Sequence, residues 1–224
     1  VYKRQSFDKA NRSSHKSKRS QMSLNAAMDI LKTIKKDFKL AVTTDVHETS
    51  QISKLVEYID VIQIPAFLSR QTDLIIAAAD TQKIINVKKG QFLSHSEVIN
   101  IIKKIESRKN KSIIITERGN TFGYNYLVND FKGIQLMKNF GYPIIFDSTH
   151  SVQIPGGLGE KSGGAREYVL PLSKAASALR IAGFFIETHP NPNVALSDGP
   201  NMVYLDKMDY LINSINKINK AAKV

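Results

Sequence analysis

Short apolar runs alternate with helix-patterned segments along nearly the whole chain, and this alternation constrains the fold more than any other feature. The runs are rich in Ile, Val and Phe, which predicts strands at 40–46, 60–65, 83–90, 112–119, 142–150 and 183–190. Helical periodicity between them predicts helices at 22–37, 49–58, 70–81, 94–107, 127–140, 165–180 and 205–221. Continuous apolar strands of this kind are typical of parallel strands buried on both faces, so the chain predicts an α/β fold.

Each expected strand carries polar residues at its C-terminal end, among them Gln63, Lys88, Arg118, His150 and Glu187. In a (β/α)8 TIM barrel all of these strand ends meet on the face that carries active sites. In an open doubly wound sheet only the ends near the switch point would be functional. The pattern therefore favours the barrel. Because a barrel has eight strands, we expect the first strand and most of the second to be missing from the start of this sequence.

The first residues are interpreted separately from the rest. Val1–Gln5 reads "VYKRQ", which one frame of a common sequencing-library transposon end encodes. We therefore interpret residues 1–5 as adapter translation and residues 6–224 as a single barrel domain that is truncated at its N-terminus. An ordinary basic strand end is the alternative.

Composition limits the class of protein. The chain has 224 residues, 42% of them hydrophobic, and no apolar run long enough to cross a membrane. It contains no cysteine, which fits a reducing cytoplasm. The net charge of +12 is compatible with nucleic acid, with anionic small substrates, or with the lysine-rich composition that AT-rich genomes encode. Neither common nucleotide-binding glycine motif is present, so we expect no nucleotide cofactor.

Two groups of side chains are candidates for chemistry. Cations at or near strand ends suit phosphate or carboxylate groups, and they are Lys9, Arg12, Arg70, Lys88 and Arg118. The second group is His150, Glu187 and Asp198, and a histidine with two carboxylates suits a divalent first-row metal. Spacing alone leaves a hydrogen-bonded trio without metal equally open. The glycine-rich stretch "IPGGLGEKSGG" beside them is either a lid or an ordinary irregular connection.

Several stretches together resemble one enzyme family. They are "SFDKANRSS", "TDVHE", "IQIPAFLSRQTDL", "INVKKGQF", "ERGNTFGYNYLVND", "IFDSTHSVQ", "SGGAREYV" and "ETHPNP" with "LSDGP". In this order they are similar to the 3-deoxy-D-manno-octulosonate 8-phosphate synthases, from Ser6 nearly to the C-terminus. The resemblance implies a cytoplasmic transferase of lipopolysaccharide biosynthesis, which condenses phosphoenolpyruvate with D-arabinose 5-phosphate and releases phosphate. The related heptulosonate-type synthases carry a Lys-Pro-Arg-Thr type motif where this chain has "KANRSS".

The resemblance also implies roles for individual residues. Lys9 would contact phosphoenolpyruvate, whereas Asn11, Arg12 and Ser13 would hold arabinose 5-phosphate. Arg70 would reach the sugar phosphate of a neighbouring subunit. The remaining substrate-binding candidates are Gln63, Ala66, Lys88, Arg118 and Ser162. The candidate catalytic residues are Lys9, Asn11, His150 and Asp198.

The family has a metal-dependent and a metal-independent branch. The metal enzymes use a strand-one Cys with His, Glu and Asp, and the others have Asn in place of that Cys. "PGGLGEKSGG" and "ALSDGP" resemble the metal branch, so His150, Glu187 and Asp198 are expected to bind Zn, Fe, Mn or a similar ion. The resemblance further suggests a homotetramer, with no nucleic-acid or membrane partner. The alternatives are a heptulosonate-type synthase, an inactive fragment, or an anion-binding or nucleic-acid-binding module.

Overall fold

The computed structural model describes residues 2–4, 23–121, 126–155, 163–195 and 197–223. The chain divides into two units, the first made of residues 1–90 and 97–114 and the second of residues 91–96 and 115–224. In each unit parallel strands alternate with helices, so the expected α/β class is confirmed.

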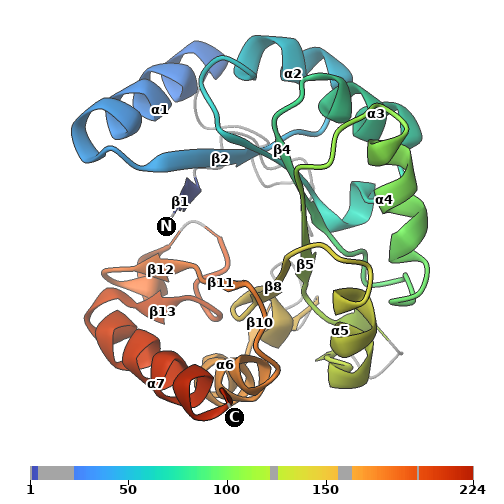
Figure 1. Cartoon of the computed structure of the whole chain (residues 1–224). Coiled ribbons are helices and arrows are strands. Elements are labelled where there is room, and N and C mark those ends of the chain that lie inside the picture. Colours follow the sequence, from blue (N-terminus) through green and yellow to red (C-terminus); the bar gives the residue numbers. More distant parts are fainter. Residues whose placement is uncertain (1, 5–22, 122–125, 156–162, 196, 224) are drawn as a thin grey trace. The chain divides into compact units, whose positions relative to one another are not determined.

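The first unit is built on four parallel strands in sequential order (Figure 1). These strands are β1 (Tyr2–Arg4), β2 (Ala41–Asp45), β3 (Val61–Ile64) and β4 (Ile84–Lys88). The helices are α1 (Leu24–Phe38), α2 (Thr49–Leu55), α3 (Thr72–Asp80) and α4 (Val98–Glu106), with a short 3-10 helix, η1, at Ala66–Leu68. Each strand is followed along the chain by a helix, which is the repeating element of parallel α/β folds.

Hydrophobic spacing explains why these segments take these forms. In α4 the buried residues are Val98, Ile101, Ile102 and Ile105, the i, i+3, i+4, i+7 spacing of one helix face. In β3 all four residues are buried, as expected for a strand covered on both faces. Helix α1 begins where the Ser23 side chain accepts a hydrogen bond from the Ala26 N–H, a standard N-cap contact.

The second unit has three parallel strands, β5 (Ile113–Glu117), β8 (Ile144–Asp147) and β11 (Gly183–Phe185), in that order. The first two residues of β5 are counted with the first unit. The helices are α5 (Phe131–Lys138), α6 (Val169–Ala178) and α7 (Met208–Ala221), preceded by the 3-10 helices η3 (Arg166–Tyr168) before α6 and η5 (Leu205–Lys207) before α7. Another 3-10 helix, η2 (His150–Val152), follows β8 and carries one of the candidate site residues.

Three short strand pairs and a hydrophobic cluster complete this unit. The pairs are β6–β7 (Asn120–Thr121 with Leu127–Val128), β9–β10 (Gln153–Ile154 with Gly163–Gly164) and β12–β13 (Thr188–His189 with Val203–Tyr204). The cluster packs α6 and α7 together and consists of Val152, Val169, Val203, Leu211 and Ile215.

The six expected strands and seven expected helices are confirmed, with shorter extents. Several helices begin later than periodicity predicted, and α4 and α5 are two examples. Helix α4 begins at Val98 rather than 94, and His95 lies in the turn before it, where it is buried against Glu117. Helix α5 begins at Phe131 rather than 127, because Leu127 and Val128 pair with β6 and the Asp130 side chain caps the helix.

The N-terminal residues take part in the first unit. Tyr2–Arg4 pair in parallel with Ala41–Thr43 of β2. Their interpretation as adapter translation stays a prediction, as do the single-domain boundaries and the missing barrel strands.

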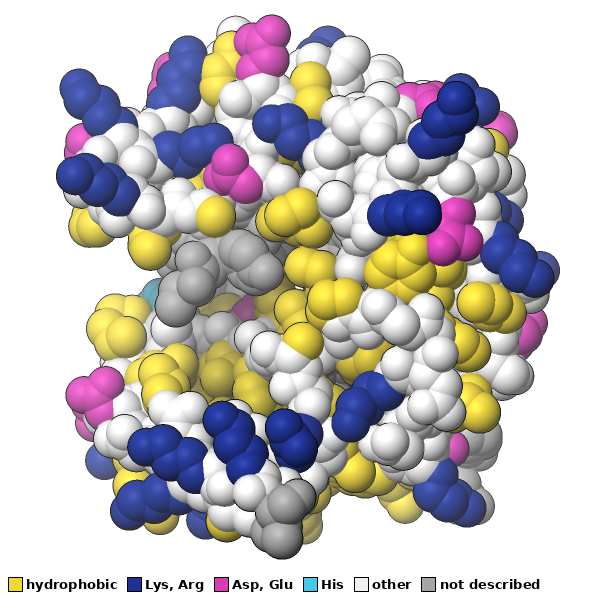
Figure 2. Space-filling view, in the orientation of Figure 1, with side chains coloured by type: hydrophobic (Ala, Val, Ile, Leu, Met, Phe, Trp, Pro, Cys, Tyr) yellow, Lys and Arg dark blue, Asp and Glu magenta, His cyan; other side chains and the backbone are white. Residues whose placement is uncertain are grey.

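The charge and hydropathy of the described residues are relevant to the nucleic-acid and membrane partners considered from the sequence. On the face drawn in Figure 2, lysine and arginine side chains are spread over several helices, with acidic and hydrophobic groups between them. Among the described residues, no helix combines the length and hydropathy that a membrane span needs.

Candidate functional site

His150, Glu187 and Asp198 come together in the second unit, as the sequence predicted. Each offers one ligand atom, and these atoms lie within 4.8 Å of one another. His150 opens the 3-10 helix η2 that follows β8, Glu187 follows β11, and Asp198 lies in the next loop. His150 Nε2 is 3.6 Å from Glu187 Oε1, which is long for a direct hydrogen bond and suits two ligands of one ion.

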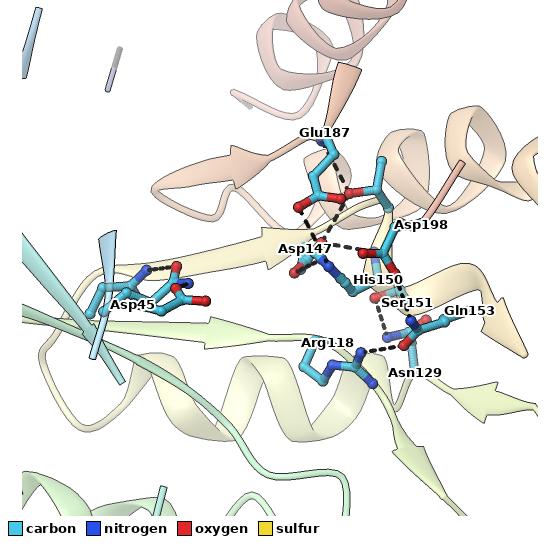
Figure 3. A network of polar contacts seen from close by, with 12 residues as sticks. Asp45, Arg118, Asn129, Asp147, His150, Ser151, Gln153, Glu187 and Asp198 are labelled. Carbon is cyan, nitrogen blue, oxygen red and sulfur yellow. Dashed lines mark hydrogen bonds and ion pairs between the residues drawn. The ribbon is translucent and has the colours of Figure 1, made fainter. Parts of the chain in front are cut away.

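Asp147 fixes the orientation of the His150 ring (Figure 3). It is fully buried at the end of β8, and its Oδ2 lies 2.8 Å from His150 Nδ1. Its other oxygen, Oδ1, accepts the His150 backbone N–H at 2.9 Å. With Nδ1 held by a carboxylate, Nε2 is the nitrogen directed at Glu187. A carboxylate behind a histidine in this way is the usual support of a metal-ligating imidazole.

The backbone fixes the other two members of the trio. The Glu187 N–H donates to Thr149 Oγ1 at 3.1 Å, which ties the end of β11 to the residue before His150. Asp198 has a φ of 56°, a left-handed conformation that aspartate tolerates better than most residues. Its carbonyl accepts the Asn201 N–H at 2.9 Å. A Cβ on the following residue, Gly199, would collide with the Pro192 carbonyl, so this turn requires glycine.

Arg118 forms a buried cationic centre in the same unit. It is only 4% exposed, and burial lowers the pKa of its guanidinium, opposed by the nearby carboxylates of Asp147, Glu117 and Asp198. Nη2 donates to Gln153 Oε1 at 3.0 Å, whereas Nη1 is buried with no hydrogen-bond partner among the described residues. A buried guanidinium with an available N–H is suited to binding an anion, because the anion both balances its charge and accepts a hydrogen bond from it.

The first unit carries a second polar group at its strand ends. Asp45, Gln63 and Asn86 lie opposite one another on β2, β3 and β4. Gln63 donates to Asp45 through Nε2 and accepts from Asn86 Nδ2 through Oε1, the latter at 3.2 Å. Lys88 ends β4 and is 6% exposed. A buried lysine beside polar strand ends is compatible with the substrate role expected for Lys88.

The other predicted residues fall into two sets. Ala66 is buried at the start of η1, and Arg70 is exposed between η1 and α3, where its carbonyl accepts from Lys104 Nζ at 3.2 Å. An exposed Arg70 fits a contact with another subunit, which stays a prediction. The predicted residues outside the described part of the chain are Lys9, Asn11, Arg12, Ser13 and Ser162, together with most of the glycine-rich stretch.

Sequence reasoning gave no role to Asp147, Gln153 or Glu117, although the structure places each beside a candidate residue. Asp147 precedes His150 by three residues, and Gln153 follows it by three, so spacing around the histidine was the available signal. Glu117 accepts the Gly119 N–H at 2.5 Å and lies 2.9 Å from His95 Nε2. These contacts brace the backbone on both sides of Arg118, and only the tertiary structure shows them.

Comparison with known proteins gives one family over the whole chain. Residues 1–223 match the family model described as the DAHP synthetase I family. Curated proteins named 2-dehydro-3-deoxyphosphooctonate aldolase are similar over the same length. The protein from Brucella anthropi is 50% identical over 223 residues, which is 100% of this chain and 80% of the relative.

Two further relatives come from different bacteria and carry the same name. The protein from Rhodopseudomonas palustris is 52% identical over 224 residues, covering 100% of this chain and 77% of the relative. The protein from Fusobacterium nucleatum is 50% identical over 218 residues, covering 97% of this chain and 78% of the relative.

Proposed function

The chain belongs to the DAHP synthetase I family, and from this premise we propose that it is a 3-deoxy-8-phosphooctulonate synthase. It condenses phosphoenolpyruvate with D-arabinose 5-phosphate and releases inorganic phosphate. The observation that carries the proposal is an identity of about half of all residues, over the whole chain, with proteins named 2-dehydro-3-deoxyphosphooctonate aldolase. Because the names of these relatives specify the octonate product, they favour this reaction over the heptulosonate type.

Both substrates are anions, so fixed cations must hold them together against their mutual repulsion. We assign Arg118 and Lys88 to the phosphoenolpyruvate phosphate and Arg12 to the sugar phosphate. The buried Nη1 of Arg118 supports the first assignment. Alignment then brings the enol carbon of phosphoenolpyruvate onto the aldehyde carbon of the sugar, which replaces a collision between two anions by a reaction within one complex.

The residues around His150 fit a divalent ion. One imidazole nitrogen and two carboxylates are a donor set that first-row divalent metals prefer, and Asp147 presents the imidazole with Nε2 toward the carboxylates. We propose that His150, Glu187 and Asp198 hold this ion. When bound, it would supply a Lewis acid for the charge that develops on the aldehyde oxygen. The chain's own cations bind and orient the substrates.

The fold implied by this proposal is a (β/α)8 barrel, of which the parallel strands and helices in each unit are the repeating parts. The proposal also includes a cytoplasmic location and a homotetramer in which the exposed Arg70 contacts a neighbouring subunit. Small anionic substrates, rather than nucleic acid, then account for the cations at the strand ends.

Phosphate release with different aldoses tests the function. The purified chain is supplied with Mn²⁺, phosphoenolpyruvate and one sugar phosphate at a time. We expect release of phosphate with arabinose 5-phosphate and only background release with erythrose 4-phosphate or with no sugar. Equal release with erythrose 4-phosphate would move the assignment to the heptulosonate type. Absence of release with either sugar would favour an inactive fragment or a binding module.

A further inference from the structure

Gln153 connects the two parts of the site in the second unit. Its Oε1 accepts from Arg118 Nη2 at 3.0 Å, and its Nε2 donates to Asp198 Oδ1 at 3.0 Å (Figure 3). The Gln153 side chain therefore connects Arg118, the buried cation suited to an anion, with Asp198, one carboxylate of the trio suited to a divalent ion. Neither sequence nor family resemblance gave this residue a role.

The chemistry of the amide allows only one orientation here. A guanidinium can only donate and a carboxylate can only accept, so the carbonyl must face Arg118 and the NH₂ must face Asp198. Both hydrogen bonds involve a charged partner and are stronger than those between neutral groups. Strand β9 carries Gln153, and its pairing with Gly163 and Gly164 of β10 fixes the backbone from which the side chain extends.

We propose that Gln153 is a positioning residue that couples anion binding at Arg118 to cation binding at His150, Glu187 and Asp198. The proposal rests on the proposed function, because it takes phosphoenolpyruvate as the anion and a divalent metal as the cation. Gln153 holds the Asp198 carboxylate in place for the ion and holds one edge of the guanidinium, so that Nη1 is directed at the substrate.

The sign of the coupling follows from the charges. Without an anion, the positive charge of Arg118 attracts Asp198, both through space and through the polarised Gln153 amide, and opposes a cation there. A bound phosphate neutralises Arg118 and removes this opposition. Anion binding should therefore tighten cation binding, and by thermodynamic linkage the cation should tighten anion binding by the same factor.

Mn²⁺ binding measured with and without phosphoenolpyruvate tests the coupling. Free Mn²⁺ is followed by electron paramagnetic resonance, with a protein-free blank for its complex with phosphoenolpyruvate. In the unmodified chain we expect phosphoenolpyruvate to tighten Mn²⁺ binding at least about fivefold. In Gln153→Met, which keeps the length of the side chain but loses both hydrogen bonds, Mn²⁺ binding should weaken about tenfold and the enhancement should shrink.

A second variant separates positioning from general destabilisation. In Gln153→Glu the new carboxylate pairs with Arg118 and adds negative charge beside Asp198. We expect weaker phosphoenolpyruvate binding, Mn²⁺ binding that is not weakened, and loss of the enhancement. Gln135→Met, at an exposed glutamine of α5, is the matched control and should behave as the unmodified chain.

The outcomes distinguish the two proposals. If the unmodified chain binds both ligands and the enhancement is unchanged in both Gln153 variants, the coupling does not run through Gln153, and the proposed function stands. If the chain binds neither Mn²⁺ nor phosphoenolpyruvate, or if Asp198→Asn binds Mn²⁺ normally, the proposed site itself is wrong and the coupling falls with it.

Discussion

At the scale of single residues, the candidate site depends on side chains that hold other side chains. Asp147 accepts from both the backbone N–H and the ring of His150. Gln153 bridges Arg118 and Asp198, and Glu117 lies between His95 and the Gly119 N–H. Each is a buried or partly buried polar group that holds a neighbouring residue in place. Removing one of these side chains should change ligand binding at the residue that it supports, although the removed side chain does not itself contact the ligand.

Asp147→Asn tests this support most simply. Aspartate contacts the His150 backbone N–H with one oxygen and the ring Nδ1 with the other. Asparagine has an oxygen at only one of these two places, so one contact is lost and the ring is no longer held in one tautomer. We expect Mn²⁺ binding to weaken about 10- to 100-fold. The nitrogen chemical shifts of His150 should also show a change of tautomer. Asp206→Asn, at an exposed aspartate in the same unit, is the control. Unchanged affinity and shifts in Asp147→Asn would remove Asp147 from the site.

At the scale of elements, close contacts decide where helices begin and which residues they tolerate. His95 precedes α4, and its ring occupies the space beside Gly133 of α5 where a Cβ would lie. Gly133 interrupts an otherwise favourable helix sequence, since glycine costs about 1 kcal/mol relative to alanine in a helix. The ring of His95, held by Glu117, explains why glycine is needed there.

The sign of Gly133→Ala should therefore depend on His95. In the unmodified chain we expect a loss of about 1–3 kcal/mol in the free energy of unfolding, from overpacking against a ring that cannot move. In the His95→Ala background the same change should stabilise by about 1 kcal/mol, because alanine favours the helix. Urea unfolding of the four chains measures both values. Gly183→Ala, where a Cβ would meet Ile145 at 3.8 Å and no other described residue within 4 Å, is the control. Equal costs in both backgrounds would refute the contact.

Asp60 joins α1, β2 and the start of β3. It accepts from Lys35 Nζ at 2.7 Å and from the Val42 N–H at 2.8 Å. Burial raises the pKa of Asp60, but these hydrogen bonds and the charges of Lys35 and Lys83 outweigh it, so the pKa lies below its usual value of 3.8. The folded chain therefore favours the charged form. This stabilisation is fully present above the unfolded-state pKa and is lost as the pH falls through the lower, folded-state pKa.

Asp60→Asn should accordingly destabilise at neutral pH and lose its effect in acid. We expect about 1 kcal/mol at pH 7, a modest value because the pair is partly exposed, and a smaller difference below about pH 3. Urea unfolding at the two pH values measures it, with the exposed Asp29→Asn as the control. A difference that stays the same at both pH values would mean that the charge of Asp60 contributes nothing.

Hydrophobic periodicity in the sequence was enough to predict which segments form helices and strands. It was not enough to predict where those elements end or which side chains hold the site residues in place. Ile113–Glu117 and Val98–Glu106 follow from local patterns of apolar residues, which are properties of the segment itself. The contact of His95 with Glu117, just before α4, joins residues that are 22 positions apart. The same holds for the site. His150, Glu187 and Asp198 were predicted from strand ends and family motifs, whereas Gln153 bridges partners 35 and 45 positions away, which no local pattern encodes.

At the scale of the whole molecule, family membership and the two subsites support one reaction. A buried guanidinium with an available N–H suits a phosphate, and a histidine with two carboxylates suits a divalent ion. The relatives' name supplies the product class that these features alone leave open. The choice of sugar is the point at which the octonate and heptulosonate readings differ.

A competition between the two sugars is the most direct test of the proposed reaction. The purified chain is given Mn²⁺, phosphoenolpyruvate and equal amounts of arabinose 5-phosphate and erythrose 4-phosphate, and the products are identified by mass spectrometry. We predict an eight-carbon 3-deoxy-ulosonate phosphate, formed in step with inorganic phosphate, while erythrose 4-phosphate remains unused. A seven-carbon product as the main species would contradict it.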